Sequence, residues 1–208
     1  EFIEGTGKDF NTVHAANYHF FEELHTVIDR EPLEFLDPEL RGLFASIGIQ
    51  KGKPFAPDER MKEILEQAAK LGNATARALF WYERKQDEFL YEGSYWKRGM
   101  VGDSHEWLSD QGLGGRNIDA RAQYFYMATF NSPAMVWKLI GKGSQYAWGY
   151  LDSKGGYLDG GKNYKLNLPG DAPAEKFMSI VVYDSQTRSM LQTDQPYPNK
   201  NNKRDKML

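Results

Sequence analysis

The sequence contains no cysteine and only four histidines among its 208 residues. Without cysteine, this chain has no disulfide, no thiol nucleophile and no thiolate ligand for a metal. Long apolar runs are missing as well, since the longest are short pieces such as residues 78–82 and 180–183. A membrane-spanning helix needs ~20 apolar residues. We therefore predict no membrane span in this chain.

Aromatic side chains are abundant: the chain has 12 Phe, 12 Tyr and 5 Trp. So many apolar anchors predict a folded chain of one or two domains. The formal net charge at pH 7 is −3. Cations cluster in residues 200–206, and a basic segment of this length is typical of a solvated stretch. Without that segment nothing resembles the basic footprint of a nucleic-acid-binding protein, so no nucleic-acid partner is predicted.

Apolar residues spaced three and four apart predict two helices within residues 17–48. The first is expected from a cap at Asn17 to about Arg30, because the following Glu31-Pro32 stops a helix. The dipeptide Asp37-Pro38 combines a capping side chain with proline at the first helical position, which predicts a second helix that closes at Gly48.

Further helices are predicted from Asp58 to about Tyr82, from a cap at Asp119 to residue 129, and from residue 132 to 139. The first of these is the longest, a rod of about 37 Å at 1.5 Å per residue. Gly72 and Asn73 are its weak point, where the alternative to a continuous helix is a break or kink. Residues 83–117 lose this periodicity and predict a long irregular segment.

From residue 144 the pattern changes to that of strands and tight turns. A strand is expected at 145–151, a turn at 152–156, a short return at 157–158 and a strictly alternating strand at 164–168. Residues 177–183 are mostly apolar and β-branched, as in a strand buried on both faces. No strand is predicted after residue 198. The class is therefore α+β, a helical region followed by an antiparallel, β-sandwich-like sheet that is incomplete in this chain.

One group of side chains offers ligands for a metal: His19, Glu22 and His25. On a helix, Glu22 lies three residues from each histidine and faces both. The two histidines are six residues apart, however, which turns them about 120° away from a common face. Exposed or capping histidines on an acidic helix are therefore the favoured interpretation, and no metal or other cofactor is predicted.

The polar residues near the expected strand ends are the ligand-binding candidates. Arg188, with Asp184 or Asp194, has the chemistry to orient an anion or polarise a carbonyl, and Lys162 and Tyr164 lie upstream. The alternative, which we favour, is a structural ion pair.

On the late helix, Arg121 and Tyr124 are further ligand-binding candidates. The favoured interpretation places them in an aromatic core, and the alternative places them in a ligand pocket. The phosphate-loop and nucleophile-elbow patterns are both missing, so no catalytic residue is predicted.

Several stretches carry a family resemblance: Phe10-Asn-Thr-Val-His14, Phe55-Ala-Pro-Asp-Glu-Arg-Met61, Gly72-Asn-Ala-Thr-Ala-Arg77, Ser132-Pro-Ala-Met135, Leu158-Asp-Gly-Gly161, Tyr164-Lys-Leu-Asn-Leu-Pro169, Tyr183-Asp-Ser-Gln-Thr-Arg-Ser-Met-Leu-Gln192 and Asp194-Gln-Pro-Tyr-Pro198. Together they resemble the two-part bacterial proteins catalogued as domains of unknown function 1254 and 1214. The resemblance implies β-sandwich domains joined by a helical region, and proteins often exported to the periplasm or secreted. It implies no activity, cofactor or catalytic residue.

This resemblance sets the expected boundaries and partners. It implies an internal fragment, in which residues 1–142 are the helical end of a first domain with its linker and 143–208 are the opening strands of the second. The expected partners are the missing N- and C-terminal segments of the same protein, or further copies in a homo-oligomer. The favoured function is a bacterial envelope-type protein that binds a ligand or partner. The alternative is a hydrolase or lyase with an acid and arginine pocket between helices and sheet.

Overall fold

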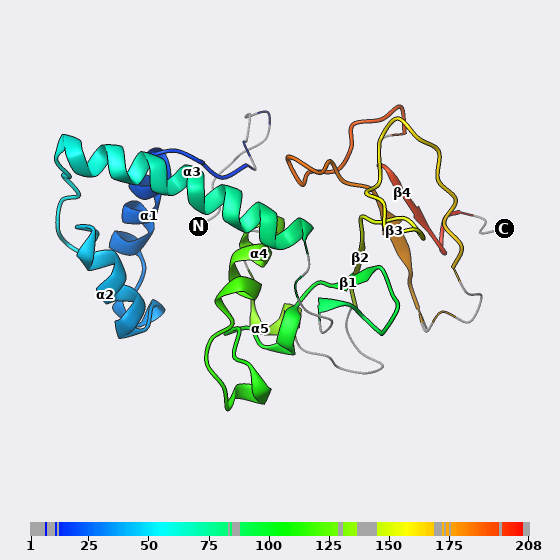
Figure 1. Cartoon of the computed structure of the whole chain (residues 1–208), viewed down its shortest axis with the longest axis horizontal. Coiled ribbons are helices and arrows are strands. Elements are labelled where there is room, and N and C mark those ends of the chain that lie inside the picture. Colours follow the sequence, from blue (N-terminus) through cyan, green and yellow to red (C-terminus); the bar gives the residue numbers. More distant parts are fainter. Residues whose placement is uncertain are drawn as a thin grey trace. The chain divides into compact units, whose positions relative to one another are not determined.

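The computed structural model describes residues 7, 11, 13–82, 84, 88–128, 131–136, 145–168, 172, 174, 176–195 and 197–205. Helices fill the first half of the chain and short antiparallel strand pairs follow, as Figure 1 shows, which confirms the predicted α+β class. The chain divides into a first compact unit, residues 1–75, and a second compact unit, residues 76–208. Among the described helices, none combines the length and the apolar character that a membrane crossing requires.

The first unit contains α1 (His19–Arg30), the short 3-10 helix η1 (Leu33–Phe35), α2 (Pro38–Ser46) and the first turns of α3 (Glu59–Trp81) (Figure 1). The predicted first helix is present as α1, which begins two residues after the expected cap. Asn17 Oδ1 still accepts a hydrogen bond from the backbone N–H of His19, at 3.1 Å. The helix ends where Glu31 takes an extended conformation before proline, as predicted.

The second predicted helix is confirmed together with its signals. The side chain of Asp37 accepts a hydrogen bond from the backbone N–H of Leu40 at 2.8 Å, and Pro38 occupies the first turn. Gly48 lies just beyond the helix with a φ of 88°. This left-handed conformation favours glycine, and it turns the chain so that Ile49 is buried.

The long third helix is also confirmed, and it continues through Gly72 without the alternative break. α3 runs for 23 residues without interruption, and Asp58 Oδ1 accepts from the backbone N–H of Met61 at 2.8 Å. A single glycine costs a helix interior only about 1 kcal/mol relative to alanine. Gly72 is therefore tolerated here without a kink.

The second unit is built around aromatic and small side chains from the end of α3 and from α4 (Ile118–Ala128). Its core consists of buried residues that pack together: Ala76, Phe80, Val101, Trp107, Ala120, Tyr124, Tyr126 and Met127. Two 3-10 helices, η3 (Val101–Asp103) and η4 (Asp110–Gly112), lie in the stretch predicted to be irregular. This core explains where much of the aromatic content of the sequence is used.

The predicted cap of α4 is wrong by two residues. Asn117 is the capping residue, because its Oδ1 accepts from the backbone N–H of Ala120 at 3.0 Å. Asp119 lies inside the first turn, where its negative charge complements the helix dipole. The last helix, α5, spans Pro133–Val136. Both its expected extension to residue 139 and the expected domain boundary at 142/143 lie outside the described residues.

Four three-residue strands form two separate antiparallel pairs. β1 (Trp96–Arg98) pairs with β2 (Ala147–Gly149), with Lys97 opposite Trp148. β3 (Ser179–Val181) pairs with β4 (Asn199–Asn201), with Ile180 opposite Lys200. The described residues thus contain two short sheets, and they do not show a closed sandwich.

The expectation that no strand follows residue 198 is wrong, because β4 lies there. β4 is polar throughout, so its backbone pairs with β3 without leaving a hydrophobic pattern in the sequence.

The strand predicted at 164–168 is absent, since these described residues form no strand or bridge. The strand predicted at 177–183 shrinks to three residues, and burial on both faces is wrong, because Phe177 is 58 % and Val182 50 % exposed. The turn at 152–156 and the return after it are confirmed by a bridge between Leu151 and Tyr157. Residues 164–168 alternate but form no strand, because a strand also needs a partner strand to pair with.

Candidate functional site

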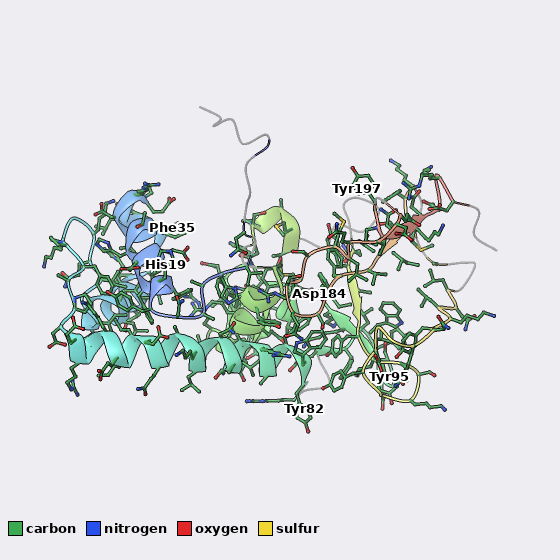
Figure 2. All side chains as sticks on the ribbon, turned by 90° about the horizontal axis from the view of Figure 1, so that it is seen from above. His19, Phe35, Tyr82, Tyr95, Asp184 and Tyr197 are labelled. Carbon is green, nitrogen blue, oxygen red and sulfur yellow. The ribbon has the colours of Figure 1, made fainter. Side chains whose placement is uncertain are left out.

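Asp184, which is labelled in Figure 2, and Arg188 lie in one tight loop after β3, where the Arg188 N–H donates to the Asp184 carbonyl at 2.9 Å. Asp184 Oδ1 accepts from the backbone N–H groups of Gln186 and Thr187, at 2.9 and 2.7 Å, and from the Thr187 hydroxyl at 3.0 Å. These donors hold the pKa of Asp184 below its ordinary value of 3.8, the Thr187 N–H having the largest effect and the charge of Arg188 a small one. The carboxylate is thus engaged within its own turn.

The guanidinium of Arg188 faces an aromatic ring of α4. Its Cζ lies 4.4 Å from the ring centroid of Tyr126, within the range of a cation–π contact. The backbone of Arg188 has a φ of 58°, and the Tyr126 hydroxyl donates to the carbonyl of Ser185 at 3.4 Å. These contacts fasten the loop to the core of the second unit. The remaining candidate of this group, Asp194, is exposed.

Lys162 and Tyr164 meet at a second turn, around Asp159. The ammonium of Lys162 lies 3.4 Å from the Asp159 carboxylate, and the Tyr164 hydroxyl oxygen accepts from the Asp159 backbone N–H at 2.8 Å. The N–H of Gly161 has the largest effect in lowering the pKa of Asp159, ahead of Lys162. All of these side chains are exposed, and their mutual contacts account for the geometry of the turn.

Tyr124 belongs to the buried core. Its ring packs against Trp107 with centroids 5.1 Å apart, and burial raises its pKa above the ordinary value of 10.0, with a smaller effect of Tyr146. Arg121, on the same helix, is half-buried. The structure therefore places Asp184 with Arg188 in one turn and Lys162 with Tyr164 in another, whereas Asp194, Arg121 and Tyr124 join neither group. None of these seven residues lines either of the two cavities described below. Their role in binding remains a prediction.

The histidines and acid proposed as metal ligands are not gathered into one site. His19 contacts Glu22 at 2.8 Å and Glu23 at 3.5 Å, and the Glu22 hydrogen bond raises the pKa of His19. The Nε2 atom of His25 instead lies 2.8 Å from the carbonyl oxygen of Lys53. Among the residues that the structure describes, no group of three or more such side chains has the arrangement of a metal site.

A buried ionic cluster in the second unit escaped the sequence prediction. Lys97 on β1 donates to Gln123 Oε1 at 2.7 Å and to the carbonyl of Phe80 at 3.1 Å, and its ammonium lies 3.2 Å from Glu88 Oε2. Glu88 and Gln123 line a cavity of about 20 Å³, large enough for one water molecule. Because two acceptors and a carboxylate surround the ammonium in the interior, this cluster organises the core.

The larger cavity lies in the first unit, between the end of α1 and the segment after α2. Its volume is about 400 Å³, within the range of small-molecule sites. Apolar side chains form most of its wall: Ile28, Leu33, Phe35, Leu36, Phe44 and Ile49. We call this cavity the apolar pocket.

Local sequence signals build the apolar pocket. Pro32 ends α1 and starts the turn of η1, while the cap at Asp37 starts α2, so the chain reverses within a few residues. The reversal leaves Leu33 50 % and Phe35 60 % exposed, and Figure 2 labels Phe35 in this region. At the other side, the turn at Gly48 brings the buried Ile49 back toward α2, where its N–H bonds the carbonyl of Phe44 at 3.0 Å.

Three charged residues line the apolar pocket: Glu31, Arg41 and Lys51. The Lys51 ammonium donates to the backbone carbonyl of Asp29. The Nε atom of Arg41 is buried and donates to no acceptor among the described residues. Helical spacing alone predicted α2 but gave no sign of this arrangement, because the pocket combines three separate segments.

Comparison with known families adds one finding. The family model described as a protein of unknown function (DUF1214) matches residues 143–208. This supports the second part of the resemblance seen in the sequence, whereas the 1254 part stays a prediction. In a search of curated proteins, none matches the chain. The matched segment contains β2, β3 and β4, and the apolar pocket lies outside it.

Proposed function

We propose that this chain binds a small, largely apolar molecule in the apolar pocket of the first unit. The observation that carries the proposal is the pocket itself, about 400 Å³ in volume with six apolar side chains in its wall. Binding sites for small molecules are typically concave and apolar, with a few polar groups that set orientation. Burying apolar ligand surface here releases about 25 cal/mol per Å², and exposed Leu33 and Phe35 would be covered at the same time.

The alternative of a hydrolase or lyase has less support. Its acid, Asp184, already accepts three hydrogen bonds within its own turn, and its arginine, Arg188, faces the Tyr126 ring. A general acid or base must reach its substrate with a free oxygen or a proton to give. The contacts of these two side chains favour a structural role for the loop.

We also infer that residues 143–208 are part of a larger β-sandwich, completed by further strands of the same protein or by another copy. The exposed apolar side chains around β3 support this inference: Phe177, Val182, Tyr183 and Met190 are all at least 46 % exposed. Apolar side chains of this size are the ones that a further strand or a second sheet would cover.

Titration with octanol tests the ligand-binding proposal. In two-dimensional ¹H–¹⁵N spectra we expect saturable shifts confined to the amides around the pocket, such as Gly42, Ala45 and Ile49. The absence of saturable shifts there, or equal shifts throughout the chain, would contradict the proposal. Octanol is a suitable probe because it is flexible, apolar and small enough for the cavity.

A further inference from the structure

The geometry points to a carboxylate-bearing ligand for the apolar pocket, held by the guanidinium of Arg41. The inference rests on the proposed function and adds the chemical class of the ligand, a small aliphatic or aromatic carboxylic acid in its ionised form. Apolar walls alone would accept a neutral molecule, so the polar lining decides between the two.

The Arg41 side chain is the group that would recognise a carboxylate. Arg41 lines the pocket, and its side chain has no hydrogen-bond acceptor or ion-pair partner among the residues that the structure describes. Its Nε atom is buried, so the terminal nitrogens of the guanidinium would meet the ligand. A carboxylate suits this group, since its two oxygens match the planar fork of a guanidinium.

The charges of the lining also favour an anion. Arg41 and Lys51 supply two positive charges, and Glu31 supplies one negative charge. The Lys51 ammonium donates to the carbonyl of Asp29, whose carboxylate in turn accepts from the N–H of Gly52 at 2.8 Å. The net charge of the lining itself is positive, and apolar walls strengthen an electrostatic contact by excluding water.

Two matched probes, octanoate and octanol, test separately whether the pocket binds a ligand and whether it prefers a carboxylate. They share the alkyl chain and differ in the charged headgroup. At neutral pH we expect octanoate to bind the wild-type chain about tenfold more tightly than octanol, the ratio expected when a charge-assisted hydrogen bond is gained. If both bind equally, the carboxylate inference is overturned while the pocket function stands. If neither binds, the pocket function itself fails.

Two variants test the role of Arg41. We expect Arg41→Met to remove the preference for octanoate and to leave octanol binding in place. Arg60→Met is the matched control, because Arg60 is an exposed arginine of α3 that does not line the pocket. It should keep the wild-type preference. A wild-type preference in Arg41→Met would overturn the inference.

A third variant keeps the test decisive if Arg41→Met does not fold. Glu31→Gln leaves Arg41 in place and removes the only acidic residue in the lining. We expect octanoate to bind this variant several-fold more tightly at low salt, with octanol unaffected, because a like charge is removed. Unchanged or weaker octanoate binding would contradict a carboxylate lying near Arg41.

Discussion

The ammonium of Lys97 lies 3.2 Å from the carboxylate of Glu88, inside the second unit, where the Lys97 side chain is only 2 % exposed. The Phe80 ring lies 5.3 Å from the same ammonium, and its backbone carbonyl is one of the acceptors. Two opposite charges withdrawn from water in this way depend on one another, because either one alone would be buried without compensation. Lys97 also links β1 to the end of α3, through the Phe80 carbonyl, and to α4, through Gln123.

Replacing Lys97 by methionine should strongly destabilise the second unit. The substitution keeps the length of the side chain but leaves the Glu88 carboxylate buried without its cation, which costs about 3–5 kcal/mol in comparable pairs. Chemical denaturation, followed by tryptophan fluorescence, measures the loss. A double variant that also carries Glu88→Leu should recover part of it, because neither charge remains. A single variant within about 1 kcal/mol of wild type, against this expected loss, would show that the pair is dispensable.

The start of α4 offers a direct comparison between two neighbouring polar side chains. Asn117→Ala should cost about 1 kcal/mol, since the capping hydrogen bond to the Ala120 N–H is lost. Asp119→Ala, the matched control two residues later, should cost clearly less. The free energies of unfolding of the two variants decide the matter. If Asp119→Ala lost as much unfolding free energy as Asn117→Ala, or more, Asp119 would be the cap that the sequence predicts.

Acid should loosen the loop that follows β3. Because the pKa of Asp184 is lowered in the folded state, its stabilisation is present above the ordinary value of 3.8 and is lost as pH falls through the folded value. Asp184→Asn lacks this ionised acceptor. Its stability deficit relative to wild type should be constant near neutrality and shrink below pH ~4.

Denaturation across a pH series measures this difference. Asp194→Asn is the matched control. Asp194 is exposed, and its carboxylate accepts no hydrogen bond from the residues that the structure describes. It should follow the wild-type curve. A deficit for Asp184→Asn that grows as pH falls would have the wrong sign for the lowered pKa.

The helices could be predicted because their signals are local. Asp37-Pro38 and Asp58 each indicate the start of a helix from a few neighbouring residues. In the structure, both aspartates accept a capping hydrogen bond from the first turn. The strands were predicted poorly, since pairing depends on a distant partner. The alternating residues 164–168 form no strand, whereas the polar β4 pairs with β3 from about 20 residues away.

The candidate sites followed the same division. The turn around Asp184 combines residues that are neighbours in the sequence, so the sequence alone indicates that Asp184 and Arg188 lie close together. Lys97 and Gln123 are 26 residues apart, and a lysine in a polar, aromatic stretch normally predicts an exposed side chain. The apolar pocket depends on three segments, around residues 28–38, 41–45 and 49–51, where the spacing of the apolar side chains predicted only helices. Only the folded arrangement shows that a cavity remains between them.

A bulky side chain that fills the apolar pocket without disturbing its walls shows whether the ligand binds there. Gly42 lines the pocket on α2, and a side chain added there meets no atom within 4 Å at its Cβ position. Gly72 on α3 has the same open surroundings and does not line the pocket, so it provides the control. Both glycines lie inside helices, where replacement by phenylalanine removes an unfavourable helical residue.

Octanol binding should therefore be measured for wild type, Gly42→Phe and Gly72→Phe, with the thermal unfolding of each variant recorded alongside. We expect both variants to remain folded. Gly72→Phe should bind octanol as wild type does, whereas Gly42→Phe should lose binding. Undiminished binding by a folded Gly42→Phe would contradict the claim that the ligand occupies this pocket.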